Sequence, residues 1–189
     1  MSRFLIALFV CCSVQLYGQD VDSLQLVIKS TDDLVAKADA YKSILNKLRS
    51  TDSIGFKQYL AEGLTFAREQ NDKETEFTLA RIDCRRLYGN GEYRKMIAKV
   101  DSLLPLAKIH GLKQIQIDLL NYSGNAYSNL SDYTNAAVQF IEYLSIATQL
   151  PDNTREVAMA NNNIGMAFLN MKRFDQAIEY LNRSLEGQQ

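Results

Sequence analysis

The stretch that decides the fold is residues 163–185, NIGMAFLNMKRFDQAIEYLNRSL. After the polar pair Lys172-Arg173, apolar residues recur with the three- and four-residue spacing of one helix face: Phe174, Ala177, Ile178, Leu181 and Leu185. This spacing is typical of an amphipathic helix. A small residue, Gly165, lies nine positions before Phe174 in the segment that precedes the turn. The stretch therefore predicts two helices joined by a short turn.

The same arrangement recurs upstream with a period of forty or forty-one residues. Leu64, Leu104 and Leu144 are forty residues apart, and Ala67, Ala107 and Ala147 follow the same spacing. An aromatic residue follows a polar turn at Tyr93, Tyr133 and Phe174, and a small residue stands nine positions before each, at Cys84, Gly124 and Gly165. Agreement of several registers at one spacing indicates an internal repeat.

The repeat predicts an all-α fold, a right-handed superhelical solenoid of antiparallel helix pairs. We expect these pairs at about 32–48 with 53–70, 73–89 with 92–109, 112–130 with 133–150, and 153–171 with 174–187. The units span about 32–71, 72–111, 112–151 and 152–189, and residues 19–31 form a leader with a short helix around Leu24 to Lys29. No segment alternates apolar and polar residues for long enough to predict a strand.

The last unit resembles a tetratricopeptide repeat. Ile164-Gly165 stands where that family has Leu-Gly, Phe168 at the aromatic of its first helix, and Ala177 at the alanine of its second helix. The third unit keeps the pattern at Gly124, Tyr127, Tyr133, Ala136 and Phe140, whereas the second and first units match more loosely. The period exceeds the family's usual 34 residues, which implies longer helices. HEAT-type repeats have a similar period but lack this order of glycine, aromatic residue and alanine.

We expect the glycines to allow close helix packing, because glycine inside a helix costs about 1 kcal/mol relative to alanine. In the repeat, Gly124 and Gly165 would let two helices approach, with Ala136 and Ala177 in the facing positions.

The first eighteen residues have a different composition. Arg3 is followed by an apolar run from Phe4 to Val14, and a polar stretch with Gly18 follows before Gln19. This order predicts a secretory signal peptide over residues 1–18 and a periplasmic or cell-surface location. In the alternative of a lipoprotein, Cys11 or Cys12 would carry the lipid. Removal of the signal leaves Cys84 as the only thiol, so no internal disulfide is expected.

Residues that carry catalysis or bind metals are sparse, so we expect no enzyme, no cofactor and no metal site. The only histidine, His110, precedes Gly111 at a helix end, where it interacts favourably with the helix dipole. Cys84 occupies a close-contact position, which indicates a buried small residue. The formal net charge of −1 is spread without blocks, which argues against nucleic acid as a partner.

The resemblance implies a concave face formed by the first helix of each pair, where a protein or peptide partner binds. By their phase with the small residue, seven residues are expected there: Arg81, Arg85, Asn121, Asn125, Asn162, Met166 and Asn170. In the family, asparagines and basic residues at such positions hold a peptide's backbone and carboxylate. Arg81 and Arg85 are expected to form a carboxylate clamp.

Two functions fit this pattern. The first is an extracytoplasmic scaffold that binds a protein or peptide partner. The alternative is the periplasmic sensory region of a membrane-spanning histidine kinase or transcription regulator, truncated in this chain, with its membrane segment expected after residue 189. The last helix also lacks a polar capping element after it, so we expect exposed apolar area over 174–187 and either further protein or a partner covering it.

Overall fold

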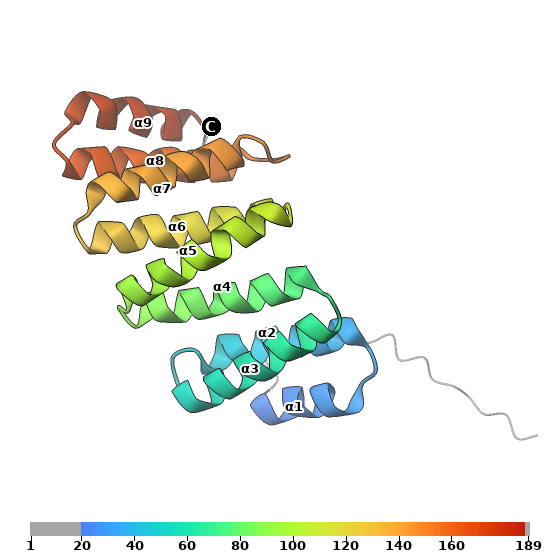
Figure 1. The fold of residues 1–189 in the computed structure, drawn as a ribbon. Helices are drawn as coiled ribbons and strands as arrows, with labels where there is room; N and C mark the ends of the chain where they lie inside the picture. The colour runs from blue at the N-terminus through green and yellow to red at the C-terminus, as the bar shows by residue number, and fades with distance from the viewer. Residues whose placement is uncertain (1–19, 188–189) are drawn as a thin grey trace, which may run out of the picture.

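The computed structural model describes residues 20–187, which form nine α-helices and no strand (Figure 1). The helices are α1 (Val21–Ser30), α2 (Leu34–Leu48), α3 (Ser53–Glu69), α4 (Lys73–Gly89), α5 (Tyr93–Ile109), α6 (Lys113–Asn129), α7 (Tyr133–Ala147), α8 (Thr154–Asn170) and α9 (Phe174–Glu186). The all-α prediction is confirmed, and the predicted helices coincide with α2 to α9 with ends within three residues. The predicted signal peptide lies outside the described residues.

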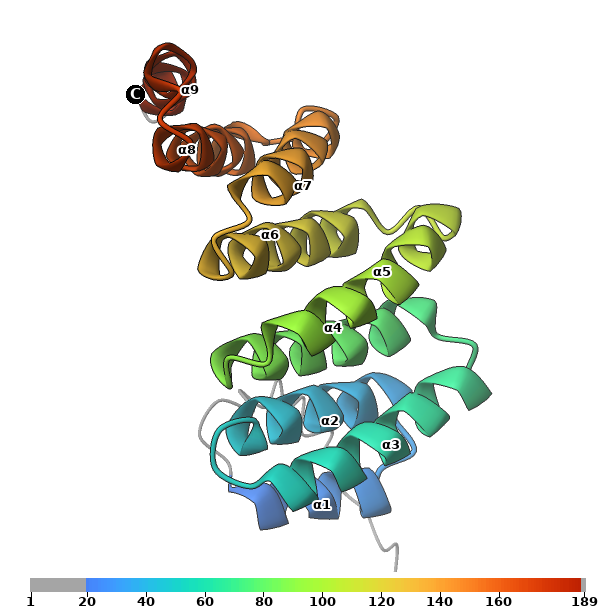
Figure 2. The ribbon, with the colours of Figure 1, turned by 60° about the vertical axis from the view of Figure 1, so that its left-hand side comes forward.

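The helices stack in chain order, each packed against the next, as a helical-repeat solenoid (Figure 2). We call α2, α4, α6 and α8 the first helices of the pairs and α3, α5, α7 and α9 the second helices. Among the first helices, α4 also packs against both α2 and α6, and no pair of second helices packs comparably within residues 20–187. The first helices α2, α4 and α6 therefore approach one another on one side of the stack, which is the arrangement expected of an inner face.

The segment predicted as a leader takes part in the packing. Leu24 of α1 is fully buried against Ala40 and Ile44 of α2. Asp20 caps the helix by accepting a hydrogen bond from the backbone N–H of Ser23 at 2.8 Å. The stack of helices thus begins at Val21 with an extra helix.

Six turns between helices use the same backbone device. One residue in each adopts the left-handed conformation, at Asn71, Gly91, Gly111, Ser131, Asp152 and Lys172. In five of them the next residue donates its N–H to a carbonyl five residues back, as from Glu92 to Leu87 at 2.9 Å. This is the Schellman end of a helix, which satisfies carbonyls left without a partner. The recurrence every twenty or twenty-one residues is the structural counterpart of the sequence repeat.

Gly124 and Gly165 lie buried inside helices at close contacts, as predicted. A Cβ atom added to Gly124 would lie 2.5 Å from Phe140 Cε1, and one added to Gly165 would lie 2.7 Å from Leu181 Cγ. The facing residues are therefore Phe140 and Leu181, and the expectation that Ala136 and Ala177 would occupy these positions was wrong. Phe140 and Leu181 follow these alanines by one helical turn on the same face, and their larger side chains reach the glycines.

A buried ionic cluster joins α4 to its neighbours. The carboxylate of Asp83 accepts a hydrogen bond from Arg86 Nε at 2.9 Å and pairs with Lys99 of α5. The Arg86 guanidinium also lies 5.0 Å from the centroid of the Phe56 ring of α3. These contacts fix the relative positions of three consecutive helices with groups that compensate one another's charge.

None of the helices described in residues 20–187 is both long and apolar enough to cross a membrane.

Candidate binding surface on the first helices

The inner face carries a small basic pocket where α2, α4 and α6 meet. Its volume is about 200 Å³, and its walls are formed by Lys42, Asn46, Thr78, Arg81, Ile82, Arg85 and Tyr122. Three of these side chains carry positive charge at neutral pH and none carries negative charge. The pocket brings together the two predicted arginines, Arg81 and Arg85, as expected from their positions one helical turn apart.

The two arginines differ in their neighbours. Arg81 forms an ion pair with Asp118 of α6, which compensates its charge. Arg85 is exposed and forms no ion pair within residues 20–187. Lys42 pairs with Asp39 at 3.2 Å, on a partly exposed part of α2. Arg85 is thus the guanidinium that is best placed to receive a carboxylate, with Lys42 as a second cation.

Tyr122 gives the pocket an aromatic wall. Burial raises the pKa of its hydroxyl and the nearby Asp118 raises it further, whereas Arg81 and Arg85 oppose the increase. The hydroxyl therefore stays protonated at neutral pH and can donate a hydrogen bond.

Beyond the pocket, asparagine side chains connect α6 to α4 and α8. Asn125 Nδ2 donates to the Asn121 backbone oxygen at 2.7 Å and to Asn121 Oδ1 at 2.9 Å. Asn163 Nδ2 of α8 donates to the same Oδ1 at 3.0 Å. Asn129 Nδ2 donates to the Tyr88 hydroxyl of α4 at 3.0 Å. Asn121 and Asn125 are therefore held in place by neighbouring amides, and the hydrogen bonds of this network link α6 to α4 and α8.

The remaining predicted residues lie on α8. Asn162, Met166 and Asn170 are exposed along one side of this helix, at the spacing of successive turns. Asn170 Nδ2 donates to the backbone oxygen of Met166 at 2.9 Å, whereas Asn162 forms no side-chain hydrogen bond within residues 20–187. None of these three side chains lines the basic pocket.

Sequence reasoning did not identify the other five residues of the pocket, nor Asn163 of the asparagine network: the five are Lys42, Asn46, Thr78, Ile82 and Tyr122. Lys42 and Asn46 belong to the first unit, where the repeat motif is weakest, so their phase could not be assigned. Tyr122 and Asn163 each follow a predicted position, Asn121 and Asn162, by one residue. A prediction that assigned two neighbouring residues per helical turn to the inner face would have included both.

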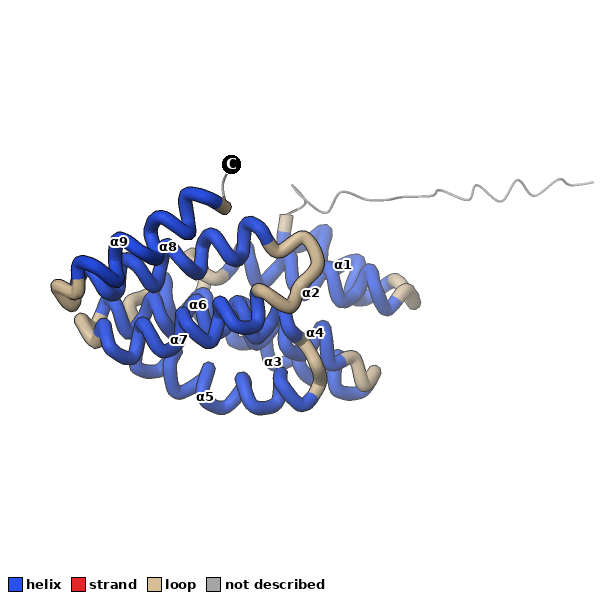
Figure 3. Tube along the Cα trace, turned by 90° about the horizontal axis from the view of Figure 1, so that it is seen from above, coloured by secondary structure: helices blue, strands red, loops and turns tan. Residues whose placement is uncertain are grey.

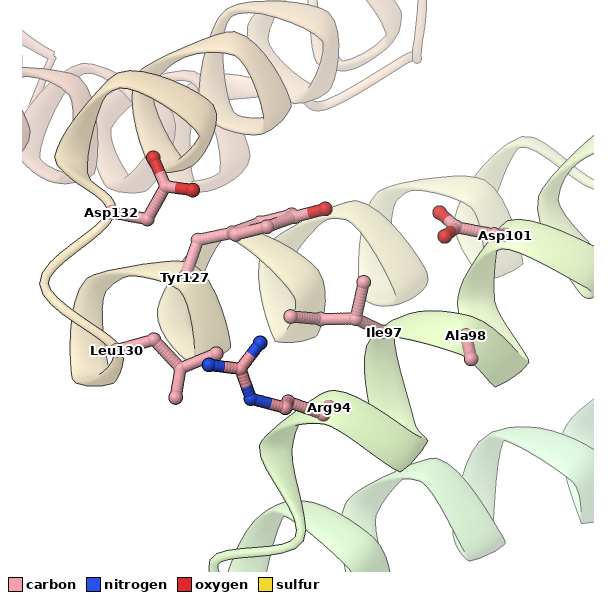
Figure 4. A pocket seen from close by; sticks show the side chains of 7 residues that line it. All are labelled: Arg94, Ile97, Ala98, Asp101, Tyr127, Leu130 and Asp132. Carbon is pink, nitrogen blue, oxygen red and sulfur yellow. The ribbon is translucent and has the colours of Figure 1, made fainter.

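Larger cavities lie elsewhere, and one of about 370 Å³ at the start of α9 is lined by residues 172–176. One of about 360 Å³ lies between α5, α6 and the turn that follows α6, with Ile97, Tyr127 and Leu130 beside Arg94, Ala98, Asp101 and Asp132 (Figure 4). Another of about 330 Å³ lies among α3, α4 and α5 and includes Leu64, Phe77, Leu103 and His110. The described part of the chain contains no group of three or more His, Cys, Asp or Glu side chains that would suit a metal ion.

The two residues with the most reactive side chains have structural surroundings. His110 caps the end of α5, and its ring lies 5.9 Å from that of Phe77. Cys84 is fully buried, and desolvation raises the pKa of its thiol to about 12, so the thiol is protonated at neutral pH.

Comparisons with known proteins agree with this geometry. Residues 116–189 match the family described as "Tetratricopeptide repeat". The fold is similar to the crystal structure of BtubC (BKLC) from P. vanneervenii, with a TM-score of 0.74 and 16% sequence identity. The similarity covers 88% of this chain and 68% of that chain, and at this identity it shows the fold alone. No curated protein matches the sequence.

Proposed function

We propose that this chain is a peptide-binding scaffold, because residues 116–189 match the tetratricopeptide-repeat family, a non-catalytic family that mediates protein–protein interaction. The partner segment binds along the inner face of the first helices, with an acidic residue or a carboxyl terminus in the basic pocket. Arg85 and Lys42 receive the carboxylate, and the asparagines of α6 and α8 contact the peptide backbone.

The observation that carries the proposal is the charge of the pocket. Arg85 has no carboxylate partner within residues 20–187, while Lys42 and Arg81 lie on the same walls. A guanidinium binds a carboxylate through paired hydrogen bonds, which are stronger than neutral ones. Asparagine both donates and accepts hydrogen bonds, which suits an extended backbone of varied sequence.

The test is a binding assay with acidic hexapeptides, each synthesised with a free carboxyl terminus and with a terminal amide. We expect the protein to select a subset of these peptides, and the comparison of free acid with amide shows whether the terminal carboxylate or an acidic side chain occupies the pocket. The double variant with Arg81→Ala and Arg85→Ala should bind the selected peptides about tenfold more weakly or worse, because hydrogen bonds to charged groups are lost.

The matched control is the pair Lys57→Ala and Arg94→Ala, which removes the same charge from exposed positions on the second helices α3 and α5. This control should bind the selected peptides as the unmodified protein does. If both double variants lose the same peptide affinity, the loss comes from the net charge of the protein and not from the pocket, which would contradict the proposal. A protein that selects no peptide would also refute it.

We also propose that this scaffold acts outside the cytoplasm, on the evidence of the apolar run Phe4 to Val14 behind Arg3. Expressed in a Gram-negative host, the full chain should be recovered from the periplasm with Gln19 as its first residue. Recovery from the cytoplasm with Met1 or Ser2 still present would contradict this location.

A further inference from the structure

The cavity of about 330 Å³ among α3, α4 and α5 has the lining of a small-molecule site, and we call it the α3–α5 cavity. Phe77 and Ala80 of its wall are buried, and the ring of Phe77 lies 5.9 Å from the ring of His110 at the end of α5. Ligand sites are mostly apolar, with a few polar groups that orient the ligand. The apolar part of this wall consists of Leu64, Phe77, Ala80, Leu103 and Leu106.

The same space is filled in the next repeat unit. Fully buried Leu120 stands forty residues after Ala80. Tyr143, also buried, stands forty residues after Leu103. Of the apolar wall only Phe77 is larger than its counterpart, so the α3–α5 cavity is space that a leucine and a tyrosine side chain occupy one unit later. There the counterparts of the wall residues pack in one core cluster, which includes Leu104, Ile117, Leu120, Tyr143, Ile146 and Leu150.

The backbone also keeps the cavity open. In Figure 1 and Figure 2, α4 and α5 leave the turn at residues 90–92 together and diverge toward the end of α5. Accordingly, α5 packs on α4 less extensively than α7 packs on α6. Pro105 lies inside α5 and has no N–H to donate to the carbonyl of Asp101, whereas α7 contains no proline. The divergence is therefore a property of this unit's own sequence.

Positive charge surrounds the apolar wall. Arg68 Nε and Lys73 Nζ donate to the two carboxylate oxygens of Glu76 at 2.7 and 2.9 Å. These three groups line the cavity with a net positive charge. Lys99 adds a third cation, and its partner, Asp83, is not part of the lining. An apolar space with an excess of cations is complementary to a ligand with an apolar body and a negative group.

The cavity and the basic pocket lie on different faces of α4. Residues three and four apart share one face of a helix, and the two sites use two such series. The series in the cavity is Lys73, Glu76, Phe77 and Ala80. The series in the basic pocket is Thr78, Arg81, Ile82 and Arg85.

We propose that the α3–α5 cavity binds a small aromatic carboxylate of one or two rings. The rings pack against Phe77 and take the space beside Ala80 and Leu103, and the carboxylate accepts hydrogen bonds from Arg68 and Lys73. Aromatic rings stabilise one another beyond the area that they bury, which favours an aromatic body over an aliphatic one. This site is independent of peptide binding on the first helices.

The test is a titration of the isotope-labelled protein, followed by amide chemical shifts, with naphthylacetate, naphthylacetamide and acetate. The shifts around Phe77, Ala80 and Leu103 should move saturably with naphthylacetate. The amide, which lacks the charge, and acetate, which lacks the rings, should each bind at least about tenfold more weakly. Shifts that move only around Arg85 and Tyr122, or equal affinity for all three compounds, would overturn the proposal.

Two variants test the two parts of the site. Ala80→Leu, which introduces the side chain found at Leu120, should fill the cavity and abolish the shifts. The double variant with Arg68→Gln and Lys73→Gln should bind naphthylacetate at least about tenfold more weakly and change the affinity for naphthylacetamide by less than about twofold.

The matched control is the double variant with Lys47→Gln and Lys57→Gln, which removes the same charge from exposed positions of α2 and α3. It should bind naphthylacetate as the unmodified protein does. Undiminished binding to a folded Ala80→Leu variant would overturn the proposal. If Ala80→Leu does not fold, the two charge variants decide, and equal affinity of both for naphthylacetate would overturn it.

Discussion

At the scale of single residues, two helix-interior glycines govern the packing of the repeat. Gly124 and Gly165 are placed so that the next helix can bring Phe140 or Leu181 against the backbone. Glycine is unfavourable inside a helix, so its presence there reflects contact rather than propensity. Gly89, at the end of α4, has no atom within 4 Å of a Cβ added to it and thus offers a control.

Gly124→Ala should destabilise the protein by about 1 to 3 kcal/mol, because the new methyl group meets the Phe140 ring in a packed core. Urea unfolding followed by circular dichroism measures the effect. Gly89→Ala should be neutral or stabilising by up to about 1 kcal/mol, because alanine favours the helix and meets nothing. A Gly124→Ala variant as stable as Gly89→Ala would show that the close contact does not constrain the fold.

At the scale of helices and turns, the left-handed residue at each turn determines how sharply the chain reverses. Gly91 and Gly111 adopt φ of 72° and 67° without steric cost, whereas Lys172 holds φ of 60° with a side chain. A non-glycine residue in this conformation costs roughly 1–2 kcal/mol. The same turn therefore has different intrinsic stability in different units.

Gly91→Ala should lower the free energy of unfolding by about 1 kcal/mol, because alanine is strained at this φ. Lys172→Gly should raise it by up to about 1 kcal/mol, since the strain is relieved at some entropic cost. Thermal or urea unfolding of the two variants gives the comparison. If both substitutions changed the free energy of unfolding equally and in the same direction, the left-handed conformation assigned to these two turn residues would be contradicted.

The helices and turns could be predicted from the sequence, whereas the contacts between repeat units could not. Helix ends, glycine positions and the exposed apolar row of α9 all follow from periodicity and turn residues within one unit. The pairing of Arg81 with Asp118 joins residues of different units, and it depends on the rotation of one pair against the next. The same rotation brings Lys42 into the basic pocket. Local patterns contain no information about that rotation, so these contacts could not be predicted.

At the scale of the whole molecule, buried thiol and phenol groups make stability depend on alkaline pH. Burial raises the pKa of the Cys84 thiol to about 12 and raises the pKa of the Tyr122 and Tyr143 hydroxyls above their usual range. In the unfolded chain a thiol loses its proton near pH 8.5 and a phenol near pH 10. Above these values the unfolded state binds fewer protons than the folded state, so the free energy of unfolding falls as pH rises.

The urea midpoint should therefore be steady between pH 7 and pH 8 and should fall progressively above about pH 9. Cys84→Ala removes the thiol and should make the decline shallower between about pH 9 and pH 10. A midpoint that stays constant to pH 10.5 would contradict the burial of these groups. In protein lacking residues 1–18, Cys84 should react with thiol reagents only after unfolding, which provides an independent measure of the same burial.

On the proposed function, the first helices bind an acidic or carboxyl-terminal peptide along their shared face. The most direct measurement is amide hydrogen exchange of the protein with and without a selected free-acid peptide. We expect slower exchange in α2, α4 and α6 around Lys42, Arg85 and Tyr122, with exchange in the second helices α3, α5 and α7 unchanged. Protection confined to the second helices, or the same protection in the variant with both Arg81→Ala and Arg85→Ala, would contradict it.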